Sequence, residues 1–346
     1  MKHEHRQLAR SIQHNCNISD ARHAGNYTMC VYLLKMREYF RWEMEQEFGA
    51  SLTRDDVGKW LSEREQLWAD IEDQDYAHLD LDGERYDPFH SDHINTKLLE
   101  HGLVYSAGIG QKSKPHFFLA NLIRHQKYGD YDIFVSSREY ARDLTSPPAM
   151  SHDKAIYIRR ESFKRMIWEK AEQWRWSKPK NAMAHAMACY DFDTDLHKAL
   201  DQMTDHELES AILHEIGEIN AAELLPGWHD MMSLLVFTQA EIMARAVRDH
   251  LADALSTLPV LLQQRQHASI HFYMANLTSM RNHIFPSLIE AYNDWSQSDD
   301  TARLTELVGT GKEHWQNVAA EMLALFDQYG ENSHEHIEQL VKNSTL

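Results

Sequence analysis

From about residue 160 to the C-terminus, hydrophobic residues recur with helical spacing, and this long pattern limits the possible folds more than any other feature of the sequence. A chain that keeps this period for half its length must pack helix against helix. The pattern predicts helices over 160–175, 179–190, 204–224, 231–256, 259–293, 301–328 and 334–343, with Pro286 as a candidate kink.

The chain before residue 160 mixes helical and strand patterns. We expect a helical region over about 6–73, in which Ser19 caps a long helix that ends at Gly49. Thr53 and Asp56 resemble a capping box that opens a second helix. Short apolar runs between turn residues predict four strands of one small sheet: 103–105, 116–122, 131–135 and 155–158.

Together these patterns predict an α+β protein that is predominantly α-helical, with a small β-sheet in the middle of the chain and a helical C-terminal half. A chain of 346 residues is too long for one ordinary hydrophobic core. We therefore expect two domains, an α+β N-terminal domain over 1–150 and a helical domain over 151–346.

The net charge and the composition limit the classes of partner that this protein can bind. The 35 basic and 53 acidic residues give a net charge of −18, which works against binding to phosphate backbones and anionic membranes. No stretch approaches the roughly 18 consecutive apolar residues of a membrane span, and the N-terminus lacks the apolar run of a secretory signal. Three cysteines form no disulfide framework. We expect a cytoplasmic protein that acts on a small molecule or peptide of unknown identity and binds neither nucleic acid nor membrane.

The predicted helix 204–224 carries the most informative residues. Thr204 and Glu207 resemble a capping box, and Pro226-Gly227 closes the far end. At about 100° per residue, Glu215 and Glu223 fall inside the apolar stripe, with Glu218 at its edge and His214 beside Glu218. The apolar members of that stripe are Leu208, Ala211, Ile212, Ile216, Ile219 and Ala222.

A carboxylate in an apolar interface must pair, take up a proton or bind a cation, because leaving it bare and charged costs several kcal/mol. One interpretation is a divalent metal (zinc, iron or manganese) held by the acidic residues and the histidine of this helix. The other is a purely structural network, in which the glutamates pair with arginines such as Arg245, Arg248 or Arg281.

The string Ile212-Leu213-His214-Glu215-Ile216-Gly217-Glu218 resembles the active-site helix of the HExxH-type zinc metallopeptidases. The resemblance implies that His214 and Glu218 bind the metal and that Glu215 is the general base for a metal-activated water. The string departs from the motif because Glu218 replaces the second histidine. The gluzincin subgroup takes its third ligand from a glutamate on the next helix, which here implies Glu241.

Three functions remain open at this point. The first is a metal-dependent hydrolase on this variant HExxE helix. A carboxylate-rich ligand set suits iron or manganese equally, so the second is a helical non-haem iron or manganese oxidase. The third is a non-enzymatic binding or assembly protein. His267 and His271 form an i, i+4 pair, of which we favour His271 as a further metal ligand. The oxidase would draw its additional ligands from Glu241, His250, Asp253, His267 and His271.

Four segments of the sequence also carry a resemblance that extends over nearly the whole chain. They are similar to a bacterial family that is known as a domain of unknown function. The resemblance implies a cytosolic protein with one architecture, and it implies no activity. The segments are 18–25, 31–38, 156–162 and 214–218.

Overall fold

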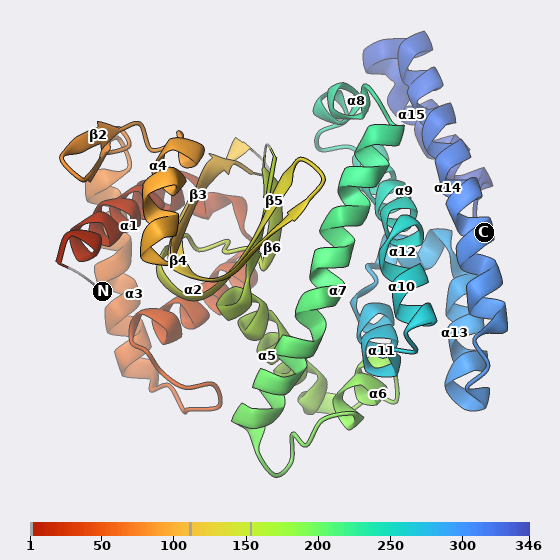
Figure 1. Ribbon diagram of the computed structural model, residues 1–346, viewed down its shortest axis with the longest axis horizontal. Helices are drawn as coiled ribbons and strands as arrows, with labels where there is room; N and C mark the ends of the chain where they lie inside the picture. The colour runs from red at the N-terminus through yellow and green to blue at the C-terminus, as the bar shows by residue number, and fades with distance from the viewer. Residues whose placement is uncertain (1–2, 111–112, 153) are drawn as a thin grey trace. The chain divides into compact units, whose positions relative to one another are not determined.

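Helices dominate the computed structural model, which describes residues 3–110, 113–152 and 154–346 (Figure 1). The predicted α+β class with a helical C-terminal half is confirmed. The chain divides into two units, Met1–Trp168 and Glu169–Leu346. The predicted division lay at residue 150, but strand β7 (Ala155–Arg159) belongs to the sheet of the first unit. Within the described ranges, no helix is long and apolar enough to cross a membrane.

The N-terminal unit begins with helices that are shorter than predicted. Ser19 does not cap a long helix, because it lies inside α1, where its hydroxyl donates to the backbone oxygen of Pro115. The chain leaves the helix at 24–26 before α2 begins. The predicted cap at Thr53 is confirmed, since its side chain accepts from the Asp56 N–H at 3.2 Å. The helices are α1 (His3–His23), α2 (Met29–Glu43), α3 (Arg54–Ile71) and α4 (Ser91–Leu98).

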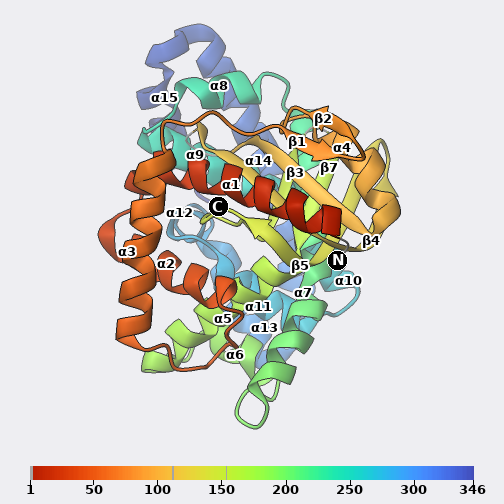
Figure 2. The same ribbon diagram turned by 90° about the vertical axis from the view of Figure 1, so that its left-hand side faces the viewer.

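A five-stranded sheet in the order β3-β4-β5-β7-β6 forms the centre of this unit. The four predicted strands are present, and the structure adds β6 and a separate two-stranded hairpin. Helix α1 runs across one face of the sheet, as Figure 2 shows, and buries Leu8 and Ile12 against Phe117 and Leu119. The strands are β1 (Leu79–Leu81), β2 (Glu84–Tyr86), β3 (Leu103–Ile109), β4 (Pro115–Tyr128), β5 (Tyr131–Arg142), β6 (Ala149–His152) and β7.

The sheet curls until its two edge strands approach each other. Gly108 lies on β3 and His152 on β6, at opposite ends of the strand order. A Cβ atom on Gly108 would lie 2.5 Å from Cδ2 of His152, so the histidine ring occupies the place of a side chain at position 108. The absence of a side chain at Gly108 on β3 therefore makes room for His152 on β6.

The C-terminal unit contains helices alone, and several predicted helices are interrupted. Helix α7 begins eight residues before Thr204, and Asp195 caps it by accepting from the Lys198 N–H at 3.0 Å. Its predicted end before Pro226-Gly227 is confirmed. The predicted helix 259–293 breaks into four helices, and Pro286 begins the last of them. The helices are α5 (Arg160–Ser177), which starts in the first unit, α6 (Ala182–Ala188), α7 (Leu196–Leu224), α8 (Trp228–Leu234), α9 (Gln239–Leu255), α10 (Thr257–Gln263), α11 (His267–Asn276), α12 (Ser279–Ile284), α13 (Pro286–Ser298), α14 (Ala302–Tyr329) and α15 (His334–Asn343).

Helix α9 is the centre of the C-terminal core, where it packs against both α7 and α14. The approach of α7 is very close at Gly217, because a Cβ atom there would lie 2.3 Å from the backbone oxygen of Ala252 on α9. Backbone cannot move aside as the end of a side chain can. Gly217 therefore sets the distance between the two helices.

Replacing Gly217 by alanine tests this contact. Gly217→Ala should force α7 and α9 apart and lower the free energy of unfolding by about 1–3 kcal/mol, the usual cost of overpacking. The matched control is Gly309→Ala on α14, where a Cβ atom meets nothing within 4 Å. That change should raise stability by about 0.5–1 kcal/mol, because alanine loses less backbone entropy than glycine. Urea unfolding of both variants measures the difference, and equal effects would contradict the close crossing.

Candidate charge network between helices α7 and α9

His214 is positioned by a buried carboxylate from the neighbouring helix. Its Nδ1 lies 2.8 Å from Oδ1 of Asp253 on α9. Asp253 is 1% exposed, and it also accepts hydrogen bonds from Arg281 and, at 2.9 Å, from the Thr257 hydroxyl. The ring of His214 is thereby fixed through Nδ1, while the side chain keeps about one-third of its surface exposed.

Glu218 pairs with an arginine of the same neighbouring helix. Its Oε2 accepts from Nη2 of Arg248, and its Oε1 lies 3.9 Å from Nε2 of His214. The side chains of Glu218 and Arg248 are partly exposed, so solvent weakens this pair more than the pair between Asp253 and Arg281. His214, Glu218 and Arg248 form the outer part of the network, and Asp253 and Arg281 form its buried part.

Glu215 differs from its neighbours because it is buried without a partner. Its side chain is 7% exposed, and among the described residues it forms no hydrogen bond and no ion pair. Burial, together with the like charge of Glu218, raises the pKa of Glu215 to about 7. A group with this pKa exchanges a proton near neutral pH. Of the three outcomes considered for a buried carboxylate, proton uptake is the one that this geometry favours.

The same charges act oppositely on His214 and Asp253. Burial alone would lower the pKa of His214, but the carboxylates of Asp253, Glu218 and Glu215 outweigh it and raise that pKa to about 10. Burial alone would raise the pKa of Asp253, yet Arg281 and His214 hold it well below its usual range. His214 is therefore a cation and Asp253 an anion at neutral pH, joined by a charge-assisted hydrogen bond.

The structure does not bring the other two predicted metal ligands to this network. Glu241 caps the opposite end of α9, where it accepts from the Phe237 N–H at 2.8 Å and from Arg245 at 2.8 Å. At about 1.5 Å per residue, it lies roughly 18 Å along the helix from Asp253. His271 lies on α11, with Nδ1 2.8 Å from the Tyr292 hydroxyl. Of the remaining histidines proposed as oxidase ligands, His250 stacks on Trp315, with its Nε2 3.0 Å from the Arg281 backbone oxygen. His267 packs against Trp295.

The residues therefore do not fit the predicted metal set. Within the described parts of the chain, no group of three or more His, Cys, Asp or Glu side chains is placed to hold a metal ion. Arginines pair with the acidic groups instead. The structural interpretation predicted such pairs for Arg245, Arg248 and Arg281. Their partners in the structure are Glu241, Glu218 and Asp253, respectively. Glu223, which was expected inside the apolar stripe, is exposed.

A second buried charge network lies in the N-terminal unit and was not predicted. Glu139 on β5 accepts from Nε and Nη2 of Arg159 on β7, at 3.0 and 2.7 Å, and from the Ser162 hydroxyl at 2.7 Å. Both charged side chains are fully buried. Since these bonds satisfy the carboxylate, we interpret this network as a structural link between two strands and the start of α5. Single-sequence patterns give no signal for such a pair.

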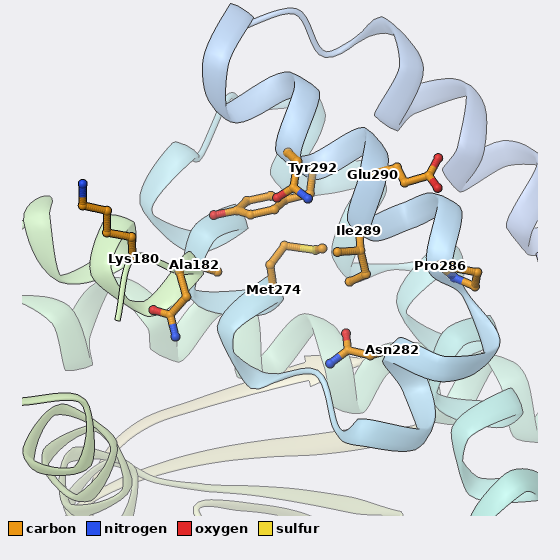
Figure 3. A pocket seen from close by; sticks show the side chains of 10 residues that line it. Lys180, Ala182, Met274, Asn282, Pro286, Ile289, Glu290 and Tyr292 are labelled. Carbon is orange, nitrogen blue, oxygen red and sulfur yellow. The ribbon is translucent and has the colours of Figure 1, made fainter. Parts of the chain in front are cut away.

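The C-terminal unit also contains a cavity of about 600 Å³, shown in Figure 3. Met274 and Ile289 lie beside Tyr292 and give the cavity an apolar side, while Asn282 lies across from them. Lys180 lies at its edge and forms no ion pair among the described residues. Sequence reasoning missed this cavity because its walls come from four helices and share no motif. The lining residues are Lys180, Asn181, Ala182, Met274, Asn282, Pro286, Ile289, Glu290, Tyr292 and Asn293.

One predicted site residue contacts this cavity indirectly. His271 shares a hydrogen bond with the hydroxyl of the lining residue Tyr292. Burial and the neighbouring His185 and His267 lower the pKa of His271 to about 4, while burial and Cys189 raise the pKa of Tyr292 to about 12. Both groups are therefore neutral at physiological pH. His271 thus orients a wall of the cavity and is not placed with His214.

The fold and these sites define a mostly helical α+β protein with a buried ion-pair network and a cavity in its C-terminal unit. The chain belongs to the family of unknown function DUF6866. The model of the N-terminal domain of that family matches residues 7–159, and the model of its C-terminal domain matches residues 164–344. No curated protein and no solved structure matches the chain. The family resemblance predicted from the sequence is confirmed, whereas the metallopeptidase resemblance gains no support.

The unpaired state of Glu215 has a pH-dependent consequence for stability. In the unfolded chain its pKa is near 4.5, so the folded protein retains a proton that the unfolded chain releases between pH 4.5 and about 7. Wild-type stability should fall as the pH rises through this window. Glu215→Gln removes that loss and should stabilise the protein at pH 8 by up to about 3 kcal/mol relative to wild type, with little difference at pH 4.5.

Urea unfolding at several pH values measures this effect. Glu223→Gln on the same helix is the matched control, because Glu223 is exposed, and its difference from wild type should be small at every pH. A Glu215→Gln variant that is less stable than wild type at pH 8 would show that the carboxylate is ionised and holds a cation or another partner.

Proposed function

We propose that the C-terminal unit binds a small organic anion with an apolar part in the cavity between α6, α11, α12 and α13. The observation that carries this proposal is the cavity itself, whose volume of about 600 Å³ lies within the usual range for small-molecule sites. This proposal corresponds to the third of the functions that the sequence left open, a non-enzymatic binding or assembly protein.

The lining residues indicate the class of ligand. Met274, Ile289 and the ring of Tyr292 offer an apolar surface for a hydrocarbon or aromatic body. Asn282 and Asn293 offer amide groups to its polar edges. The charged lining residues are Lys180 and Glu290, and Glu290 lies 3.1 Å from Arg303. Lys180 is therefore the cation available to a carboxylate or phosphate group, once its flexible side chain turns inward from the outward direction seen in Figure 3.

A metal-dependent enzyme remains the second candidate function, and Glu215 is the specific observation that favours it. A buried carboxyl group without a partner, beside a histidine and a second glutamate, is a chemically reactive arrangement. Glu215 would move a proton, and His214 would stabilise negative charge. The divalent metal (zinc, iron or manganese) stays a prediction. Glu218 and Asp253 are already paired with arginines, so a metal would have to displace these arginines to bind here.

We also propose a cytoplasmic location. The three cysteines are free, with Cys16 buried and Cys30 and Cys189 exposed. Exposed free thiols suit a reducing compartment. The sequence led us to expect a small molecule or peptide as substrate or ligand. The anion-binding proposal limits this class to a small organic anion.

Binding is tested by thermal unfolding in the presence of benzoate, hexanoate and phenyl phosphate. A ligand at about 100 times its Kd should add about 2.7 kcal/mol to stability. Lys180→Gln should weaken binding of the effective anion about tenfold or more, because it removes a charge-assisted hydrogen bond. Lys198→Gln is the matched control, since Lys198 is exposed and outside the cavity. Equal affinities of the two variants, or no stabilisation by any probe, would argue against the proposal.

Elemental analysis of the full-length protein, purified without a histidine tag, separates the two candidate functions. The anion-binding proposal leads us to expect zinc, iron and manganese far below one ion per chain. Near-stoichiometric metal that is lost in His214→Gln would instead support the enzyme, provided that the exposed control His229→Gln keeps it.

A further inference from the structure

The first two turns of α2 form an apolar surface, which we call the α2 patch. It consists of Met29, Cys30, Val31, Leu33 and Leu34. All five residues are exposed, and the exposed fractions of the four other than Cys30 run from 42% at Val31 to 70% at Met29. A helix with apolar residues on all sides is normally buried. Contiguous exposed apolar residues usually mark a site of interaction. The start of α2 therefore lacks the covering that its composition requires.

A second apolar surface lies in the C-terminal unit, from the end of α7 to the first turn of α9, and we call it the α8–α9 patch. It consists of Leu224, Leu234, Val236, Phe237 and Ile242, with exposed fractions from 40% at Val236 to 83% at Phe237. Phe237 has a φ of 67°, in the left-handed region that bulky residues rarely adopt. Its N–H donates to Glu241 at 2.8 Å, which holds this conformation.

Phe237 is one of eight non-glycine residues with a positive φ among the described residues, and it is the one whose side chain is large, apolar and exposed. Strain of this kind costs about 1–3 kcal/mol and persists only where the surrounding structure fixes it. Here its effect is to present a large aromatic ring to solvent instead of packing it. Aromatic side chains of this type are common anchors of protein interfaces.

Charge distinguishes the two surfaces and indicates what each one binds. Among the charged side chains of α2 that are not buried, the cations Lys35 and Arg37 outnumber the acid Glu43. Glu38 and Arg41 are buried and pair with each other. From 223 to 245, the acids outnumber the cations, since this segment has Arg245 as its single Lys or Arg against three acids. Two like patches paired across a twofold axis would face charge of their own sign. The α2 patch and the α8–α9 patch complement each other in charge and share apolar character.

We propose that two copies of this chain associate head to tail, with the α2 patch of one copy on the α8–α9 patch of the other. Such a contact uses two different surfaces, so one copy retains an unused α8–α9 patch and the other an unused α2 patch. Further copies then add until a ring closes or an open chain forms. The association is independent of the cavity, and its failure leaves the anion-binding proposal unaffected.

Two charge substitutions on the full-length chain test this contact by sedimentation or light scattering. The wild-type mass should rise with protein concentration up to about 1 mM, where even a millimolar contact is half formed. Leu34→Asp and Phe237→Asp should each remain monomeric, because each destroys one of the two surfaces. An equimolar mixture of the two variants keeps one intact contact, between the α8–α9 patch of Leu34→Asp and the α2 patch of Phe237→Asp. The mixture should therefore give a dimer that does not grow.

The matched control is Ile123→Asp, which charges a residue that is 54% exposed on β4 and lies outside both patches. It should associate as wild type does. Circular dichroism of all variants should give unchanged unfolding temperatures, since the substituted side chains are exposed. A monomeric wild type, a mixture that stays monomeric, or loss of association in one single variant but not in the other would each overturn the head-to-tail contact.

Discussion

The close crossing of α7 and α9 at Gly217 is the contact on which the C-terminal unit depends. With no side chain at this position, the backbones approach until the Ala252 carbonyl fills the place of a Cβ atom. Polar residues close to Gly217 on α7, three residues before it and directly after it, must then meet polar residues of α9. His214 reaches Asp253 on one side, and Glu218 reaches Arg248 on the other. A wider separation would leave these charged groups partly buried and without partners, at a cost of several kcal/mol. The glycine and the ion pairs therefore require each other.

Helical period predicted most of the helices, because it reports which face of each helix is buried, and together with the short apolar runs of the strands it predicted the class of the fold. The helices α14 and α15 match the predictions within a residue. The interruptions were missed where no glycine or proline marks them. Arg265 ends α10 with a φ of 52°, and Thr278 caps α12 by accepting from the Arg281 N–H. Within 259–293, apolar residues continue on both sides of these breaks, so the pattern reads as one helix. The long helix expected from Ser19 also failed, although Gly25 lies in the interruption at 24–26, because apolar residues continue past it.

For the site, the sequence predicted burial and could not predict partners. Glu215 is buried as its place in the apolar stripe requires. Whether an acid on one helix meets an arginine or another ligand depends on the rotation and register of the next helix. The register here pairs residue 217 with residue 252, which sends Glu241 to the distant end of α9. The gluzincin resemblance that implied Glu241 as a ligand therefore does not agree with the packing of these two helices. The cavity could not be predicted because its ten lining residues converge from two segments, 180–182 and 274–293, that are more than 90 residues apart in the chain.

The balance of charge around Glu215 explains why a proton suits this site better than a metal. His214, Arg248 and Arg281 bring three positive charges to the network, and Glu218 and Asp253 bring two negative charges. Asp249, whose pKa burial raises, and Glu215 are the remaining acids. One further negative charge makes the network neutral, so Glu215, whose pKa is about 7, keeps its proton once Asp249 is ionised. A divalent ion would have to bring both acids to the ionised state and still leave an excess of positive charge. That excess disappears if His214 loses its proton, but the pKa of about 10 opposes this loss at neutral pH. Any metal must therefore compete with the proton on His214 as well as with Arg248 for Glu218.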